Sequence, residues 1–233
     1  MIKAVCFDFF NTLSYYYPSR EETYQKACAA IGLDIEQKNL SKSLMVADIY
    51  WREQNRIKPY QKRNKPAQFL LFTNYVHRLI NGAGVKINWL QAARIVTRLI
   101  KIKWDFAVFE DAIPVMNALR QKGILVGIVS NADNSYNEIF RSLGLLDAAD
   151  FTVTSVEAGC EKPEPAIFML ALEKAKAKPE EVLFVGDQYT VDVIGARNVG
   201  MKPLMIDRNN WQEEITDCTR IQSLKQIEQF LES

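Results

Sequence analysis

The stretch Val5-Cys6-Phe7-Asp8-Phe9-Phe10-Asn11-Thr12-Leu13 places a carboxylate directly after a short apolar run. Residues 2–7 are mostly apolar, which is typical of a strand covered on both faces of a parallel sheet. We therefore expect Asp8 to lie at the carboxyl end of a buried strand. A single Asp at such a position more often forms a turn than a functional site, so its meaning depends on the residues that accompany it.

Apolar runs recur along the chain and alternate with helical patterns. Further strands are expected at 124–129, 151–154, 182–185 and 203–206. Helices are expected at 111–122, 135–143, 165–176, 191–198 and 223–231. Strands that alternate with helices of this length predict an α/β protein with a doubly wound parallel sheet.

Residues 15–105 interrupt this alternation. They hold helical periodicities without a convincing strand, at 20–31, 37–54, 66–80 and 87–100. The simplest interpretation is a helical insertion after the first strand, which folds as a separate bundle. We expect a core made of 1–14 and 106–233, and an inserted domain at 15–105. Its connections to the core would be Pro18 and the segment 104–109.

Composition and charge narrow the class of protein. With 233 residues, 48% of them hydrophobic, the chain can bury a full core. Residues 15–105 carry 16 basic and seven acidic side chains, whereas the remainder carries 13 basic and 21 acidic ones. The basic insertion suggests attraction to an anionic substrate or to nucleic acid, whereas its individual basic side chains are more simply interpreted as solvated surface residues. Basic residues interleaved with aromatic ones lack a recognition motif, so we expect no nucleic-acid partner.

The cysteines and the N-terminal run suggest a compartment. The four cysteines show no paired or regular spacing and are interpreted as reduced thiols. The first apolar run ends at Asp8, too short for a signal peptide or a membrane span. We therefore expect a cytoplasmic protein without a membrane partner, either a monomer or a homodimer.

Polar groups follow several of the predicted strands. Ser130 and Asn131 end the second strand, Lys162 follows the run at 151–154, and Asp187 comes after Gly186 with Asp192 five residues later. Ligands bind outside the carboxyl ends of strands in such sheets, so we expect these groups to gather with Asp8. Three neighbouring carboxylates are costly unless cations offset them. Lys162 and Mg²⁺ could do so, and one carboxylate could then act as a nucleophile.

Taken in order, the four motifs resemble those of the haloacid dehalogenase superfamily over nearly the whole chain. They are Asp8-Phe9-Phe10-Asn11-Thr12, Val129-Ser130-Asn131, Lys162-Pro163, and Gly186-Asp187 through Asp192. The resemblance implies a Rossmann-like core with a helical cap of the C1 type inserted after the first motif. It also implies a hydrolase.

The resemblance further implies roles for these residues. Asp8 would be the nucleophile that attacks phosphorus, with Lys162 neutralising it. Substrate contacts would come from four residues, namely Thr12, Ser130, Asn131 and Lys162. Mg²⁺ would be held by Asp8, Asp187 and the backbone carbonyl of Phe10, and Asp192 would be either a ligand or an acceptor behind the ligands.

Phe10 departs from the pattern of the phosphatases in this superfamily. They usually carry a second Asp there, which protonates the leaving group. General acid–base groups typically contribute about 10²–10⁴-fold to the rate. Hydrolysis of alkyl phosphates should therefore be slow, while aryl and acyl phosphates, whose leaving groups need less protonation, should react faster.

Other branches of the superfamily also lack that Asp and define the alternatives. The 2-haloacid dehalogenases carry Tyr there and need a cap Arg, for which Arg20 and Arg52 are candidates. Phosphonoacetaldehyde hydrolases carry Ala and use a cap Lys, for which Lys26 and Lys42 can be considered, although nothing singles them out. A protein that binds a phosphorylated ligand or partner with little turnover is a further alternative.

The fourth motif decides among them. Dehalogenases work without a metal, and Asp187 would add an uncompensated negative charge to a metal-free site. The sequence therefore favours a Mg²⁺-dependent phosphatase for a small phosphorylated metabolite, which reacts through an aspartyl-phosphate at Asp8.

Overall fold

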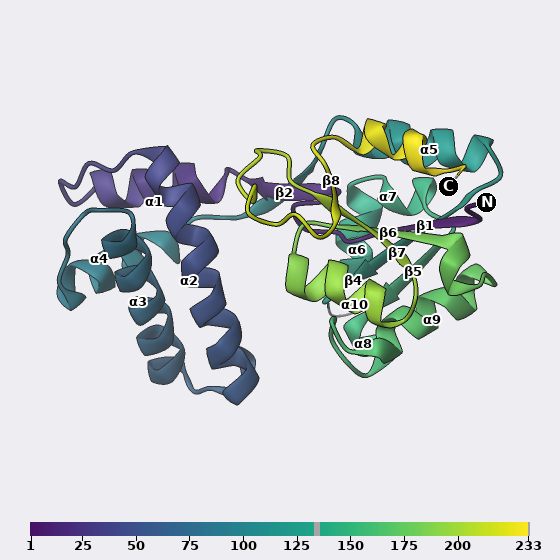
Figure 1. The fold of residues 1–233 in the computed structure, drawn as a ribbon. Coiled ribbons are helices and arrows are strands. Elements are labelled where there is room, and N and C mark those ends of the chain that lie inside the picture. The colour runs from purple at the N-terminus through teal and green to yellow at the C-terminus, as the bar shows by residue number, and fades with distance from the viewer. Residues whose placement is uncertain (133–135, 233) are drawn as a thin grey trace. The chain divides into compact units, whose positions relative to one another are not determined.

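The computed structural model describes residues 1–132 and 136–232 and divides into two compact units. The larger unit consists of Met1–Tyr15 and Phe106–Ser233, and the smaller of Tyr16–Asp105. Figure 1 shows the elements of each unit. The first residue of the helix predicted at 135–143 lies outside the described residues.

The larger unit is built on a six-stranded sheet in the order β5-β4-β1-β6-β7-β8, in which neighbouring strands run parallel. Its strands are β1 (Ala4–Phe7), β4 (Leu125–Ser130), β5 (Phe151–Thr154), β6 (Val182–Gly186), β7 (Lys202–Ile206) and β8 (Thr219–Ile221). Helices cover both faces of the sheet (Figure 1). The predicted α/β fold with a doubly wound parallel sheet is confirmed.

Strand β1 explains why the opening run is continuously apolar. Val5 and Phe7 pack into the apolar cluster on one face of the sheet, whereas Ala4 and Cys6 pack into the cluster on the other. All four side chains are buried, as expected for a strand covered on both faces. Burial raises the pKa of the Cys6 thiol to about 12, so this cysteine is an unreactive part of the core.

The helices of the larger unit follow the predicted pattern with two differences. They are α5 (Ala112–Gln121), α6 (Tyr136–Ser142), α7 (Leu145–Ala148), α8 (Ser155–Ala158), α9 (Pro165–Ala175) and α10 (Ile194–Asn198), with a 3₁₀ turn η2 (Pro179–Glu181). The helix predicted at 191–198 begins earlier, as the π-helix η3 (Tyr189–Val193).

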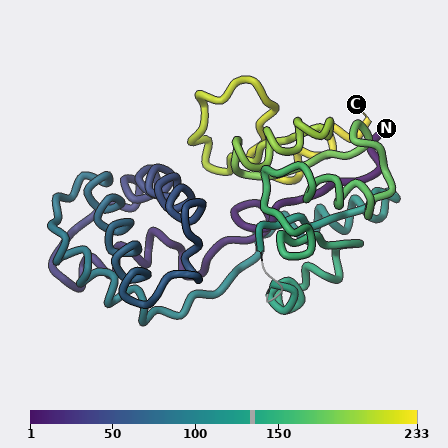
Figure 2. Tube along the Cα trace, turned by 90° about the horizontal axis from the view of Figure 1, so that it is seen from below, coloured from purple at the N-terminus to yellow at the C-terminus, as the bar shows by residue number. Residues whose placement is uncertain are grey.

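The helix predicted at 223–231 is the 3₁₀ helix η4 (Leu224–Phe230). Leu224, Ile227 and Phe230 pack against the core at a spacing of three residues, which matches the period of a 3₁₀ helix. The two chain ends meet beside this helix, where Ile2 N donates to the carbonyl oxygen of Leu231 at 3.2 Å (Figures 1 and 2).

The smaller unit is a bundle of four helices, as the periodicities predict. They are α1 (Arg20–Ala29), α2 (Gln37–Ile57), α3 (Lys65–Gly82) and α4 (Trp89–Leu99), with a 3₁₀ turn η1 (Tyr60–Lys62). Helix α3 packs against α2 and α4 around a buried core that includes Leu40, Leu79 and Ile95. Among the described residues, no helix is long and apolar enough to cross a bilayer.

Two short strands were not predicted. Strands β2 (Ser14–Tyr17) and β3 (Asp105–Val108) form a two-stranded sheet, where only connecting segments were expected. Each has four residues, too few to show an alternating pattern. Strand β8 (Thr219–Ile221) was missed for a similar reason. It has only three residues, and the charged Arg220 at its centre leaves no apolar run.

Candidate active site

The predicted site residues meet at the carboxyl end of the central strands. Strand β1 lies between β4 and β6. Asp8 directly follows β1, Ser130 is the last residue of β4, and Asp187 directly follows β6. The backbone N–H of Asp8 donates to Val185 of β6 at 2.8 Å, which holds Asp8 beside that strand. The sheet order thus brings together residues that are far apart in the sequence.

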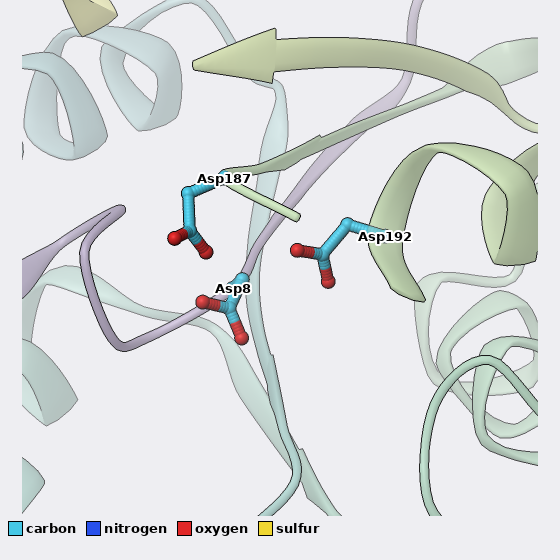
Figure 3. A group of neighbouring side chains, drawn as sticks. All are labelled: Asp8, Asp187 and Asp192. Carbon is cyan, nitrogen blue, oxygen red and sulfur yellow. The ribbon is translucent and has the colours of Figure 1, made fainter. Parts of the chain in front are cut away.

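Three carboxylates lie close together at this edge of the sheet, as Figure 3 shows. One oxygen each from Asp8, Asp187 and Asp192 lie within 4.8 Å of one another. Asp8 Oδ2 and Asp187 Oδ1 are buried and have no hydrogen-bond partner among the residues that the structure describes. Buried carboxylate oxygens left in this way are suited to a hard divalent cation. The donor set therefore fits a metal site.

Lys162 supplies the cation within this cluster. Its Nζ donates to Asp8 Oδ1 at 2.6 Å and to Asp192 Oδ1 at 2.7 Å. Burial disfavours the charged ammonium, but the two carboxylates outweigh this effect and raise the pKa of Lys162 above its usual value. Lys162 therefore remains protonated and offsets one of the three negative charges.

The uncompensated negative charge shifts the pKa values of the carboxyl groups. Burial raises the pKa of Asp8 to about 6, even though Lys162 opposes the shift. Burial and the neighbouring Asp8 and Asp192 also raise the pKa of Asp187. In the protein alone the cluster thus resists full ionisation, and a bound cation would relieve the repulsion.

The turn after β6 explains the Gly-Asp pair of the fourth motif. A Cβ atom on Gly186 would lie 2.3 Å from Asp192 Cγ, so only glycine permits this approach. The π-helix η3 brings Asp192 back to the strand end, where its Oδ2 accepts from the backbone N–H of Gln188 at 3.0 Å. Both carboxylate oxygens of Asp192 accept hydrogen bonds, one from Lys162 and one from Gln188.

Asn131 binds the backbone on which Lys162 sits. Its Nδ2 donates to the carbonyl oxygen of Lys162 at 2.9 Å, and its Oδ1 accepts from the N–H of Lys162 at 2.6 Å. This reciprocal pair fixes the Lys162 backbone against the end of β4. Ser130 lies next to it, buried.

Residues 8–14, which we call the Asp8 loop, fold tightly after β1. The N–H groups of Leu13 and Ser14 donate to the carbonyl oxygen of Phe9 at 3.0 and 2.9 Å. Asn11 adopts the left-handed conformation (φ 59°), which Asn tolerates better than most residues. The hydroxyl of Thr12 is buried and has no partner in the described part of the chain. It is thus available to a ligand.

Phe10 turns toward other aromatic side chains. Its ring is partly buried against the larger core cluster, and its centroid lies 6.4 Å from that of Phe106. Position 10 therefore offers an apolar ring, whereas the phosphatases that the motifs resemble usually carry an acid at this position.

Sequence reasoning missed several residues that contact this site, among them Asn11 and Arg208. Asn11 Nδ2 donates to Asp187 Oδ2 at 3.2 Å and so orients that carboxylate. Arg208 Nη2 donates to the carbonyl oxygen of Thr12 at 2.8 Å. Asn11 could have been suspected from its place in the first motif, but Arg208 follows β7 without any local signal.

A parallel sheet binds its ligands at the carboxyl ends of the strands, and a buried carboxylate–lysine pair at that place is suited to enzymatic catalysis. The chain belongs to the haloacid dehalogenase-like hydrolases, whose family model matches residues 2–200. The resemblance of the four motifs is thereby confirmed, while the C1 type of the cap stays a prediction.

Individual relatives agree with this membership. A glyceraldehyde 3-phosphate phosphatase of Methanopyrus kandleri is 32% identical over 215 residues, which cover 91% of this chain and 87% of that protein. A HAD phosphatase from Thermococcus onnurineus has a TM-score of 0.60 at 22% identity, covering 99% of this chain and 98% of that one. An L-2-haloacid dehalogenase has a TM-score of 0.69 at 20% identity, covering 100% and 99%. The two solved structures support the fold alone.

Proposed function

We propose that this protein is a Mg²⁺-dependent phosphatase for a small phosphorylated metabolite, with Asp8 as its nucleophile. The observation that carries the proposal is the contact of Lys162 with Asp8 and Asp192, beside a third carboxylate on Asp187. One lysine cannot balance three carboxylates, so the site favours a further cation. A bound divalent cation would in turn attract an anionic substrate, whose oxygens could serve as additional ligands.

The metal would be held by Asp8, Asp187 and the backbone carbonyl of Phe10. Asp8 Oδ2 and Asp187 Oδ1 are the carboxylate oxygens left without a protein partner in the described residues. The chemistry that Mg²⁺ supplies when bound is neutralisation of these charges and polarisation of a phosphoryl oxygen. Asp192 would act on Lys162, because both of its oxygens already accept hydrogen bonds from protein groups.

The reaction would take two displacements at phosphorus. An oxygen of Asp8 attacks phosphorus, and the bond from phosphorus to the leaving oxygen breaks with its electron pair on that oxygen. Water then attacks the phosphorus of the aspartyl-phosphate, and the Asp8 carboxylate is released with inorganic phosphate. Lys162, Ser130 and the Thr12 hydroxyl would bind the phosphoryl oxygens during both steps. Asn131 would hold Lys162 in place, since both its polar atoms bind the Lys162 backbone.

Phe10 sets the preference among leaving groups. A phenyl ring cannot protonate the departing oxygen, so that oxygen must leave as an anion or take its proton from water. Aryl and acyl phosphates tolerate this better than alkyl phosphates. The relative from Methanopyrus kandleri is described as acting on glyceraldehyde 3-phosphate, which makes that compound the first alkyl substrate to try.

Arg20 bears on the dehalogenase alternative. Its guanidinium donates to both oxygens of Asp48, at 2.8 and 2.7 Å, and also contacts the Tyr75 hydroxyl. A guanidinium paired in this way has its charge balanced within the smaller unit. It is therefore a poor anchor for the carboxylate of a haloacid.

The test is a panel of phosphate esters assayed with Mg²⁺ or with a chelator, alongside chloride release from 2-chloropropionate. We expect phosphate release that needs Mg²⁺, with p-nitrophenyl phosphate and acetyl phosphate cleaved faster than glyceraldehyde 3-phosphate. Asp8→Asn should abolish it. Chelator-insensitive chloride release would instead establish the dehalogenase, and beryllofluoride binding without turnover in either assay would establish a binding protein.

A further inference from the structure

The guanidinium of Arg208 joins three segments of the larger unit. Its Nη2 donates to the carbonyl oxygen of Thr12 at 2.8 Å and to Asp111 Oδ1 at 2.9 Å. Its Nη1 donates to Asp111 Oδ2 at 3.1 Å. The guanidinium also lies over the ring of Phe109, 3.7 Å from its centroid. The edge of the Arg208 guanidinium is thus bound by Asp111, and its face packs on the Phe109 ring.

Asp111 is itself fixed in place. Its Oδ2 accepts from the Ser223 hydroxyl at 2.8 Å and from the N–H of Leu224 at 2.9 Å. Asp111 and Arg208 side chains keep only 9% and 16% of their surface exposed. A guanidinium bound to both oxygens of a rigid carboxylate has little freedom to turn. The pairing leaves one hydrogen of Nη2 directed at the Thr12 carbonyl oxygen, while the buried Nε has no hydrogen-bond partner among the described residues.

The Thr12 carbonyl is the atom of the Asp8 loop that Arg208 contacts. Most backbone hydrogen bonds within residues 8–14 are local, such as those of Leu13 and Ser14 to Phe9. The Phe109 N–H donates to Leu13 at 3.0 Å, and Arg208 adds a charged donor one residue earlier. Fixing the Thr12 backbone also fixes its hydroxyl, which is buried and open to a ligand.

We propose that Arg208 is a positioning residue that holds the Asp8 loop through the Thr12 carbonyl and so orients Asp8 and Thr12 for phosphoryl transfer. This inference rests on the phosphatase function proposed above. Arg208 acts through the loop, and no contact of its own with the substrate is required. A displacement of about 1 Å at a reacting group can cost on the order of 10²-fold in rate.

Two variants separate positioning from folding. Arg208→Met removes both the contact with Thr12 and the partner of Asp111. Arg208→Lys keeps a cation for Asp111, but a single ammonium cannot reproduce the planar fork that reaches both Asp111 oxygens and Thr12. The matched control is Arg120→Met, because Arg120 likewise donates to an acid, Asp150, and to a backbone carbonyl, that of Asp147, away from the loop.

The measurements are kcat and KM for p-nitrophenyl phosphate with Mg²⁺, stability to urea, and hydrogen exchange of the amides in residues 9–14. We expect Arg208→Lys to keep most of the stability while kcat falls about 10- to 100-fold and exchange in the loop rises. Arg120→Met should leave kcat and loop exchange unchanged.

Wild-type kcat and wild-type loop exchange in a folded Arg208→Lys protein would overturn the positioning role while leaving the phosphatase intact. If wild type shows no turnover, the phosphatase proposal fails, and loop exchange in Arg208→Lys still decides whether Arg208 holds the Asp8 loop. Should Arg208→Met fail to fold, the comparison of Arg208→Lys with Arg120→Met remains decisive.

Discussion

Lys162 Nζ lies 2.6 Å from Asp8 Oδ1, although 154 positions separate the two residues in the chain. The side chains keep 2% and 8% of their surface exposed. A buried ion pair costs much desolvation, and the loss of one partner leaves the other charge without compensation. The same ion pair is therefore expected to affect both the stability of the protein and the proposed reaction at Asp8.

Replacement of Lys162 by Met should destabilise the protein markedly. It leaves Asp8 and Asp192 buried without their shared cation, and we expect the free energy of unfolding in urea to fall by about 3–5 kcal/mol at neutral pH. Lys174→Met is the control, since Lys174 pairs with Glu157 where 31% and 42% of the side chains are exposed. Its loss should cost less than about 1 kcal/mol. Equal losses in the two variants would contradict a buried charge cluster.

The position of the candidate site could be predicted because apolar strand patterns in the sequence end at its polar residues, and a parallel sheet brings such strand ends together. Asp8, Ser130 and Asp187 each stand at the end of an apolar run, and parallel strands bring such ends to one edge. Because both faces of these strands are buried, their runs are unbroken and easy to read. The order of the strands then places residues of distant motifs side by side.

The finer contacts could not be predicted because they depend on side chains that meet only in the folded chain. Asn131 was predicted to contact the substrate, and that role stays a prediction; its contact with the Lys162 backbone was not foreseen. Arg208 is 196 positions from Thr12, and its neighbours carry no motif. The 3₁₀ form of Leu224–Phe230 was missed because its apolar residues at 224, 227 and 230 fit either helix type in so short a segment.

Magnesium should stabilise the folded protein through Asp187. A ligand that binds only the native state adds about 2.7 kcal/mol at 100 times its dissociation constant. We therefore expect Tm to rise with added Mg²⁺ and to fall back with a chelator, measured by calorimetry. Asp187→Asn should remove most of this response. Asp217→Asn, which alters a surface acid bound by Tyr189 and Arg197, should keep it. A full Mg²⁺ response in Asp187→Asn would rule out the proposed ligand set.

Asp111 should make stability depend on acid pH. Burial opposes its ionisation, but Arg208, Ser223 and the Leu224 N–H together lower the pKa of Asp111. A carboxyl group with a lowered folded-state pKa contributes stability above its unfolded pKa, about 3.9, and loses it as pH falls through the folded value.

The variant Asp111→Asn isolates this contribution. The difference in unfolding free energy between wild type and Asp111→Asn should be largest near neutral pH and shrink below about pH 4. Urea titrations across this range measure it. Arg208→Met should weaken the same pH dependence, because it removes the cation that favours the charged form. A difference that stays constant down to acid pH would show that the Asp111 charge is not what stabilises this junction.

The substitution Phe10→Asp should place a proton donor near Asp8, the proposed nucleophile. It replaces a ring that packs near Phe106 with a carboxyl group two residues after Asp8. A general acid contributes about 10²–10⁴-fold where the leaving group is a poor one, so kcat should rise for glyceraldehyde 3-phosphate far more than for p-nitrophenyl phosphate. Phe10→Asn is the control, because it removes the same ring and is close to Asp in shape but cannot donate an acidic proton. The ratio of alkyl to aryl turnover, measured for all three proteins, should increase in Phe10→Asp alone. An equal increase in Phe10→Asn would mean that the Phe10 ring obstructs the leaving group, and that the missing acid is not what limits turnover of alkyl phosphates.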